Sequence, residues 1–300
     1  MPKPKHRNSY SRRKGGQGPG MVAFGAVIAA ILVLVIIRLI VPHAASTGNP
    51  QDGKPVAPTI VQQLSTVPTA AYAAAGLKGA PLAYGAGKAI WRVDGKPVFF
   101  YLGGEYCPYC GASRWSMITA LARFGKWSGL EYMTSSSTDV YPNTPTFTFV
   151  HATYQSPYVD FQPVEGWNRS GPAATYTLET PDAQQAAAIS KYSTAPYVPQ
   201  GVANAIPFMD LGNRYIWEGS LYDPALLQGL TWPGIARSIH AGKGPVAQAV
   251  LSAANVLSAG ICALDGGRPA VVCTSAPVAA AAARLPGVNL GKQPVGGGTA

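Results

Sequence analysis

A Cys-Pro-Tyr-Cys tetrapeptide occupies residues 107–110, where an apolar run ends and a helical pattern begins. The run at residues 97–102 is continuous and rich in aromatic and β-branched side chains, which is typical of a strand buried on both faces. Beyond the motif, apolar residues recur at three- to four-residue spacing from Trp115 to Phe124, as in a helix with one buried stripe. A buried strand that leads directly into a helix favours an α/β fold.

The junction between strand and helix makes the two sulfurs chemically unequal. We expect Cys107 at the helix N-cap and Pro108 at the first helical position, where its missing N–H costs no hydrogen bond. Free N–H groups and the positive end of the helix dipole then stabilise a thiolate on Cys107. Cys110 lies one turn inside the helix, about 5–6 Å away at Cβ, where it can resolve a mixed disulfide. The motif therefore predicts thiol–disulfide exchange.

Two other interpretations of this pair are a zinc half-site and a permanently closed bridge in a non-enzymatic binding module. Zinc usually needs a second close-spaced pair of ligands, whereas ten residues separate Cys262 from Cys273 and the four histidines are scattered. We expect no metal or other cofactor. For Cys262 and Cys273 we predict a structural disulfide, worth on the order of 2–3 kcal/mol for so short a loop. A second redox pair that relays electrons is the alternative.

The positive charge of the chain is concentrated at its N-terminus. The formal net charge is +10, but the first twenty residues carry six bases and no acid, and the chain beyond Arg38 carries 16 bases against 13 acids. The apolar run 21–41 is long enough to cross the ~30 Å hydrocarbon core, and the positive-inside rule places the basic tail 1–20 in the cytoplasm. We therefore expect a single-pass cell-membrane protein with an extracytoplasmic C-terminal domain and no nucleic-acid partner. A cleaved signal peptide is the alternative.

The remaining chain divides into a linker at 42–58, a globular domain at 59–285 and a tail at 286–300 that we expect to be disordered. Gly212-Asn213 predicts a two-residue hairpin turn between strands at 206–211 and 214–217. Residues 135–200, rich in Ser, Thr, Tyr and Pro, are expected to form an insertion. Further elements are expected as a helical region at 59–76 interrupted at Pro68, strands at 130–134 and 146–150, and helices at 183–192, 224–240 and 245–257.

The succession of strand, Cys-Pro-Tyr-Cys and helix resembles the thioredoxin superfamily, and Pro-Tyr is typical of its glutaredoxin branch. More closely, segments 104–115, 122–125 and 145–149 resemble domain of unknown function 929, an uncharacterised thioredoxin-like family of actinobacteria and archaea. The resemblance implies a thioredoxin-like three-layer α/β domain with a central mixed sheet, and an insertion between the cysteine helix and a cis-proline hairpin.

The resemblance also implies a substrate-binding surface around the dithiol. Pro207 fits the place of the cis-proline, so Ile206 would offer backbone groups to a substrate, and Pro108 and Tyr109 would lie against it. These features together predict a membrane-anchored thiol–disulfide oxidoreductase that acts on exported proteins and is reset by a membrane redox partner.

Two charged residues near the motif carry further expectations. Glu105, two residues before Cys107, is a candidate for proton transfer, although a carboxylate close to the thiolate would raise the pKa of that cysteine. Arg114, one turn beyond Cys110, is expected on a solvated face of the helix.

Overall fold

The strand before the cysteine motif, β3 (Lys96–Gly104), is the centre of the fold and has the predicted position. The computed structural model describes residues 48–87 and 89–287, and all structural statements below concern these residues. The basic tail expected at 1–20, the membrane helix expected at 21–41 and most of the tail expected at 286–300 lie outside them.

β3 belongs to a six-stranded mixed sheet. β8 (Asp160–Trp167) pairs with β3 in parallel, and β9 (Phe208–Leu211) pairs with its other side in antiparallel orientation. β10 (Tyr215–Glu218) extends the sheet beyond β9, and the short strands β1 (Tyr84–Gly85) and β2 (Arg92–Val93) lie at its edges. The hairpin turn between β9 and β10 has positive φ at both Gly212 and Asn213, which is the conformation that the sequence predicted there.

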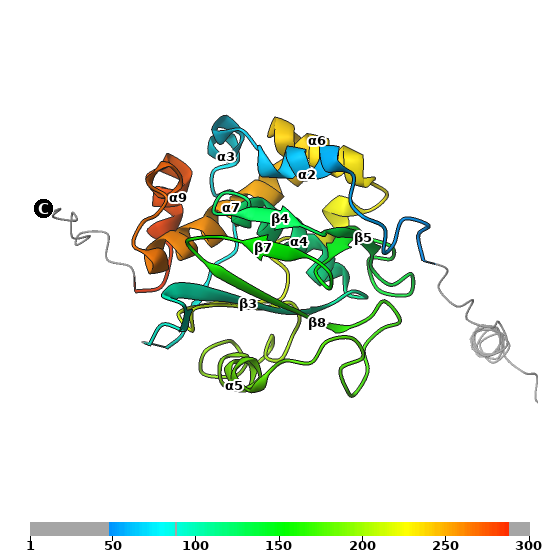
Figure 1. Ribbon diagram of the computed structural model, residues 1–300, viewed down its shortest axis with the longest axis horizontal. Helices are drawn as coiled ribbons and strands as arrows, with labels where there is room; N and C mark the ends of the chain where they lie inside the picture. The colour runs from blue at the N-terminus through cyan, green and yellow to red at the C-terminus, as the bar shows by residue number, and fades with distance from the viewer. Residues whose placement is uncertain (1–47, 88, 288–300) are drawn as a thin grey trace, which may run out of the picture. The chain divides into compact units, whose positions relative to one another are not determined.

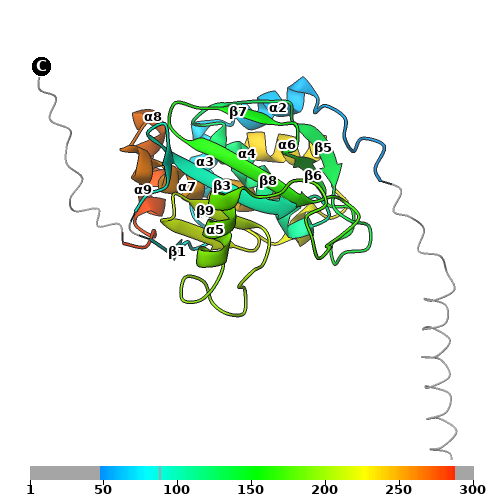
Figure 2. The same cartoon turned by 60° about the horizontal axis from the view of Figure 1, so that its bottom comes forward.

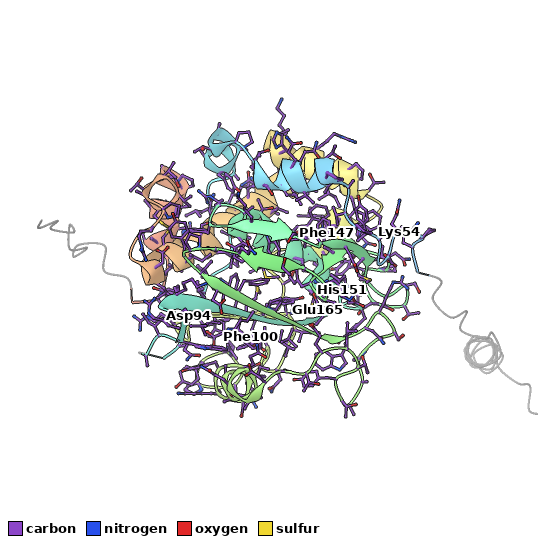
Figure 3. The ribbon with its side chains drawn as sticks, in the orientation of Figure 1. Lys54, Asp94, Phe100, Phe147, His151 and Glu165 are labelled. Atoms are coloured by element: carbon purple, nitrogen blue, oxygen red, sulfur yellow. A yellow bond between two sulfur atoms is a disulfide. The ribbon has the colours of Figure 1, made fainter. Side chains whose placement is uncertain are left out.

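Helices cover both faces of this sheet, namely α4 (Pro108–Leu121), α5 (Ala183–Tyr192) and α7 (Gly244–Asp265). Figures 1 and 2 show α5 on one face and α4 with α7 on the other. Successive side chains of a strand point to opposite faces, so Phe100 enters the core beneath α5 and Phe99 enters the larger core beneath α4 and α7. Figure 3 shows Phe100 on the α5 side and Phe147 on the other. Burial on both faces explains why the β3 sequence is continuously apolar.

α4 is buried on all sides, whereas the sequence predicted a single buried stripe. Thirteen of its fourteen residues are buried, and Tyr109 is the exposed one. α7 packs along α4, and the paired strands β5 (Glu131–Thr134) and β6 (Pro145–Thr148) cover another side. Periodicity detects a helix with one solvated face, and here these partners leave no such face. The expectation that Arg114 is solvated is therefore wrong.

The remaining elements surround this core. Pro68 separates the first two helices, as the sequence predicted, and the helix expected at 224–240 is instead a short 3₁₀ turn followed by a separate helix. These elements are α2 (Pro58–Ser65), α3 (Thr69–Ala75), β4 (Lys126–Ser128), β7 (Thr153–Gln155), η1 (Pro224–Leu227), α6 (Trp232–Ala241), α8 (Ala270–Cys273) and α9 (Ala276–Ala282).

Two expected boundaries need correction. The region 135–200 contains β8 and α5, which belong to the central sheet and its covering layer, so it is not wholly an insertion. β8 was not predicted because Pro163 lies inside it and proline is unfavourable within a strand. The strand forms because it pairs with β3. Residues 42–47 of the expected linker lie outside the described residues, and residues 48–58 enter the fold, since the backbone N–H of Val56 donates to the Leu130 carbonyl at 2.9 Å.

Among the described residues, α7 is the helix long and apolar enough to cross a membrane, but 83% of its apolar window is buried inside the domain. It also approaches the sheet closely, because a Cβ atom added at Gly260 would lie 2.7 Å from Leu211 Cδ2. These contacts are those of a core helix.

Cys262 and Cys273 form the predicted disulfide, with a Cα–Cα distance of 5.5 Å. Cys262 lies in the last turn of α7, and Cys273 ends α8. Gly266 and Gly267 have φ values of 84° and 79°, which turn the chain back between the two helices. The bond therefore closes a short loop at the end of the core helix.

Replacing both Cys262 and Cys273 by serine should lower the free energy of unfolding by about 2–3 kcal/mol, because the closed loop restricts the unfolded chain. Disulfide exchange at Cys107 should be unchanged, since the two pairs lie on different elements. Thermal unfolding and exchange with a small disulfide measure the two effects. A double variant of full stability that has lost exchange would instead show that the second pair relays electrons.

Candidate active site

Cys107 lies at the start of α4, shortly after the end of β3, as the sequence predicted. Cys107 is the N-cap residue, with φ −80° and ψ 119°, and Pro108 begins the helix. The Cys107 sulfur accepts a hydrogen bond from the backbone N–H of Cys110 at 3.2 Å. The sulfur thus takes the place that a serine or aspartate side chain has at an ordinary N-cap.

The two sulfurs differ in access. Both cysteines are free thiols, Cys107 with 4% of its surface exposed and Cys110 with none. Cys107 thus retains a small exposed area, whereas Cys110 has none.

Their acidities also differ in the predicted sense. Burial raises the pKa of Cys107, but hydrogen bonds from the side chain and backbone of Cys110, together with the charge of Arg114, outweigh burial and leave the pKa lowered. The pKa of Cys110 is raised well above its usual value, first by burial and then by the hydrogen bond and charge of Cys107. Cys107 is thus the thiol that ionises first.

The loop before β9 brings Ile206 and Pro207 to the dithiol. The Ile206–Pro207 peptide bond is cis, and the Cys107 thiol lies 3.9 Å from the Ile206 carbonyl oxygen, to which it donates. Cys107 and Ile206 are far apart in the sequence. They meet in space because Leu102 on β3 pairs with Phe208 on β9. Ile206 is half-buried and Pro207 is buried.

Glu218 supports this loop and was not identified from the sequence. It pairs with Phe208 across the hairpin, and its carboxylate accepts a hydrogen bond from the Ser193 hydroxyl at 2.5 Å. That hydroxyl accepts in turn from the backbone N–H of Asn204, two residues before Ile206. Burial raises the pKa of Glu218 to about 7, against hydrogen bonds from Ser193 and the Ala205 backbone. A lone glutamate at a strand end gives no sequence signal for such a contact.

Glu105, the predicted candidate for proton transfer, is 8% exposed. Burial raises its pKa, and a hydrogen bond with Thr148 partly offsets this. Within residues 48–87 and 89–287, no hydrogen bond joins its side chain to either cysteine. Its role in proton transfer stays a prediction.

Arg114 and Glu165 form a buried ion pair beside the dithiol. Arg114 Nε and Nη2 donate to the two carboxylate oxygens of Glu165 at 2.8 and 2.6 Å, and both side chains are 0% exposed. Nη2 also donates to the Gly104 carbonyl at 2.9 Å. Figure 3 shows Glu165 on β8, in the interior of the domain. Glu165 was not predicted from the sequence, because the sequence of β8 does not have the pattern of a strand.

Two tyrosine rings contact each other next to the cysteine motif. Tyr109 is 37% exposed, and its ring contacts that of Tyr141 edge-on at a centroid distance of 5.7 Å. The backbone N–H of Ser136 donates to the Tyr106 carbonyl at 2.8 Å, which fixes the neighbouring loop next to Cys107. A cavity of about 260 Å³ adjoins this loop, lined by Tyr106, Ser136, Thr138, Asp139, Val140, Ser170, Gly171 and Pro172.

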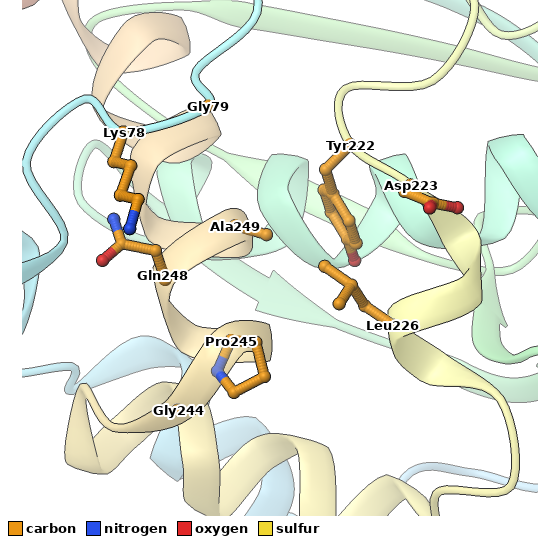
Figure 4. A pocket seen from close by; sticks show the side chains of 9 residues that line it. All are labelled: Lys78, Gly79, Tyr222, Asp223, Leu226, Gly244, Pro245, Gln248 and Ala249. Carbon is orange, nitrogen blue, oxygen red and sulfur yellow. The ribbon is translucent and has the colours of Figure 1, made fainter.

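A larger pocket of about 600 Å³ lies apart from the dithiol and is lined by Lys78, Gly79, Tyr222, Asp223, Leu226, Gly244, Pro245, Gln248 and Ala249. Figure 4 shows Lys78 and Gln248 on one side, with Tyr222 and Leu226 facing them. Neither cysteine of the motif lines it, so it does not belong to the site described above.

The arrangement of the other cysteines bears on the zinc interpretation. Cys262 and Cys273 are bonded to each other, which removes their thiolates as ligands for an ion held by Cys107 and Cys110. In the part of the chain that the structure describes, no group of three or more His, Cys, Asp or Glu side chains is placed to hold a metal ion.

The family model described as Domain of unknown function (DUF929) matches residues 91–263, which include the dithiol, β8, the Ile206–Pro207 loop and most of α7. No curated protein matches the chain. No solved structure matches it either.

In the reduced protein, iodoacetamide should modify Cys107 well before Cys110, because Cys107 is more acidic and more accessible. The modification rate should rise with pH and reach half its maximum below about 8.5, the usual value for a cysteine. Mass spectrometry of peptides after timed alkylation measures both rates. Equal rates for the two thiols would remove the assignment of Cys107 as the attacking sulfur.

Glu218→Gln should flatten the pH dependence of stability. The folded-state pKa of about 7 exceeds the unfolded value, so the folded state is favoured at low pH and loses stability as pH rises from about 4 to about 7. Burial also raises the pKa of Asp210 to about 7, so Asp210 should still cause part of the pH dependence of stability in the Glu218→Gln variant. Urea unfolding at several pH values, with Asp210→Asn as the matched variant, tests this. An unchanged slope in Glu218→Gln would contradict the assignment.

Proposed function

This chain belongs to the family described as Domain of unknown function (DUF929), and from that premise we propose that it is a membrane-anchored extracytoplasmic thiol–disulfide oxidoreductase. The description of the family names no activity, so the proposal rests on the residues of the chain. The observation that carries it is the pair of unequal thiols at the start of α4: Cys107 has a lowered pKa and a small exposed area, whereas Cys110 has a raised pKa and is fully buried.

The order of the core elements supports a thioredoxin-like fold. β3, α4 and β8 form a parallel unit, α5 leads to the antiparallel hairpin β9–β10, and α7 returns to the face that α4 covers. The sheet order β8-β3-β9-β10 between two helical layers supports the three-layer arrangement that the sequence resemblance implies. The insertion is then the region of β4 to β7, which lies between α4 and β8.

In the oxidising direction, a substrate thiolate attacks Sγ of Cys107 in the Cys107–Cys110 disulfide, and Cys110 leaves as a thiolate that takes a proton. A second substrate thiolate then attacks the substrate sulfur of the mixed disulfide. The substrate disulfide forms, Cys107 leaves as a thiolate, and two electrons have passed from the substrate to the dithiol. The lowered pKa of Cys107 favours this departure.

In the reducing direction, the Cys107 thiolate attacks one sulfur of a substrate disulfide, whose S–S bond breaks so that the other sulfur leaves as a thiolate. Cys110, once deprotonated, then attacks Sγ of Cys107. The Cys107–Cys110 disulfide forms, the second substrate sulfur leaves as a thiolate, the two thiolates take up the protons of the dithiol, and two electrons have passed to the substrate. The N–H and carbonyl of an extended substrate would pair with the backbone at Ile206, whose carbonyl already faces Cys107. The potential of the membrane partner that resets the dithiol selects the direction. The basic tail and apolar run at the N-terminus support placement of the domain outside the membrane.

Replacing Cys110 by alanine should trap mixed disulfides between Cys107 and exported proteins, because the resolving sulfur is absent. Cys110 is fully buried, so the small alanine side chain leaves the surface of the site unaltered. Non-reducing electrophoresis of the membrane fraction, followed by mass spectrometry, identifies the adducts.

The matched control is Cys107→Ala together with Cys110→Ala, which should trap nothing. A folded Cys110→Ala protein without adducts in cells would instead support the interpretation as a binding module.

A further inference from the structure

We propose that the Arg114–Glu165 pair is a positioning device that holds one positive charge against the Cys107–Cys110 dithiol and thereby sets how readily the dithiol gives up its electrons. The inference rests on the proposed redox function and adds to it two residues outside the cysteine motif.

A shared carbonyl links the guanidinium to the dithiol. Arg114 lies one helical turn beyond Cys110 on α4, and its Nη2 donates to the Gly104 carbonyl at 2.9 Å. The same carbonyl accepts the backbone N–H of Cys107 at 3.2 Å. Glu165, on β8 beside the end of β3, holds the guanidinium in this orientation through two hydrogen bonds. The charge therefore has a fixed place relative to both sulfurs.

Stability alone does not account for the pair. Among the described residues, Arg114 Nη1 has no hydrogen-bond partner although the side chain is fully buried, and the hydroxyl of neighbouring Tyr101 has none either. Each such group costs free energy relative to water. A buried ion pair can often be exchanged for apolar residues without loss of stability, so stability alone does not explain why an ion pair lies at this place.

A second effect is the electrostatic field that the Arg114 charge exerts on the sulfur atoms of Cys107 and Cys110. The charge of Arg114 lowers the pKa of both cysteines, whereas the charge of Glu165 raises the pKa of Arg114 and of Tyr101. A positive field stabilises the thiolate of the reduced form and leaves the uncharged disulfide unaffected. The pair should therefore make the dithiol a stronger oxidant than the helix start alone would.

Substitutions of the two partners separate this role from a purely structural one, because they should act in opposite directions. Glu165→Gln leaves the Arg114 charge uncompensated, so thiolate formation at Cys107 should become roughly tenfold more favourable. Arg114→Met removes the positive charge, so thiolate formation should become roughly tenfold less favourable. Mere loosening of the fold would move both variants the same way, toward an ordinary thiol.

The measurements are the pH dependence of Cys107 alkylation and the equilibrium of the dithiol with reduced and oxidised glutathione. Glu165→Gln should shift this equilibrium toward the dithiol, and Arg114→Met toward the disulfide. Shifts of the same sign, or none in either variant, would overturn the proposal.

A double variant, Arg114→Met with Glu165→Leu, covers the case in which the single variants do not fold. It removes both charges and keeps the core filled, and Cys107 should become less acidic while the fold persists. An unchanged Cys107 acidity in the folded double variant would overturn the proposal. Failure of the proposed function has a different signature, since the wild-type dithiol would then not exchange with glutathione at all.

Discussion

The geometry of the candidate active site depends on the burial of β3 on both faces. Its alternating side chains enter two cores, so the strand is held between α5 and the pair α4–α7 and its last residue, Gly104, has a fixed place. The Gly104 carbonyl then meets both the Cys107 N–H and the Arg114 guanidinium. Because the strand end is fixed, the start of α4 is fixed too, with Cys107 keeping 4% of its surface exposed and Cys110 none.

The sequence predicted those parts of the site that local patterns determine. β3, the N-cap position of Cys107 and the Gly212–Asn213 turn each follow from neighbouring residues, and the structure has all three. The pairing of Cys262 with Cys273 followed from spacing and the number of cysteines. The place of Ile206 beside Cys107 came from family resemblance, since no local pattern connects residues 99 positions apart.

Contacts between distant elements explain what the sequence did not predict. Arg114 is buried because its guanidinium lies against the end of the central sheet, where it donates to Glu165 on β8 and to the Gly104 carbonyl on β3. Strand pairing places Glu165 opposite Gly103 on β3 and Glu218 opposite Phe208 on β9. β8 is a strand because it pairs with β3 over most of its length. Polar residues inside apolar layers are the places where local patterns and tertiary structure disagree, and Arg114 and Glu165 are two of them.

The proposed redox function can be tested by titration of the purified protein in graded glutathione buffers. If Cys107 and Cys110 exchange, the thiols counted at each ratio should show one reversible transition in which both appear together. For a two-electron couple, a tenfold change in equilibrium constant corresponds to about 30 mV, which fixes the slope of that transition. A Cys107–Cys110 disulfide that no buffer reduces while the protein stays folded would contradict the redox function, because the pair would then be a permanent bridge.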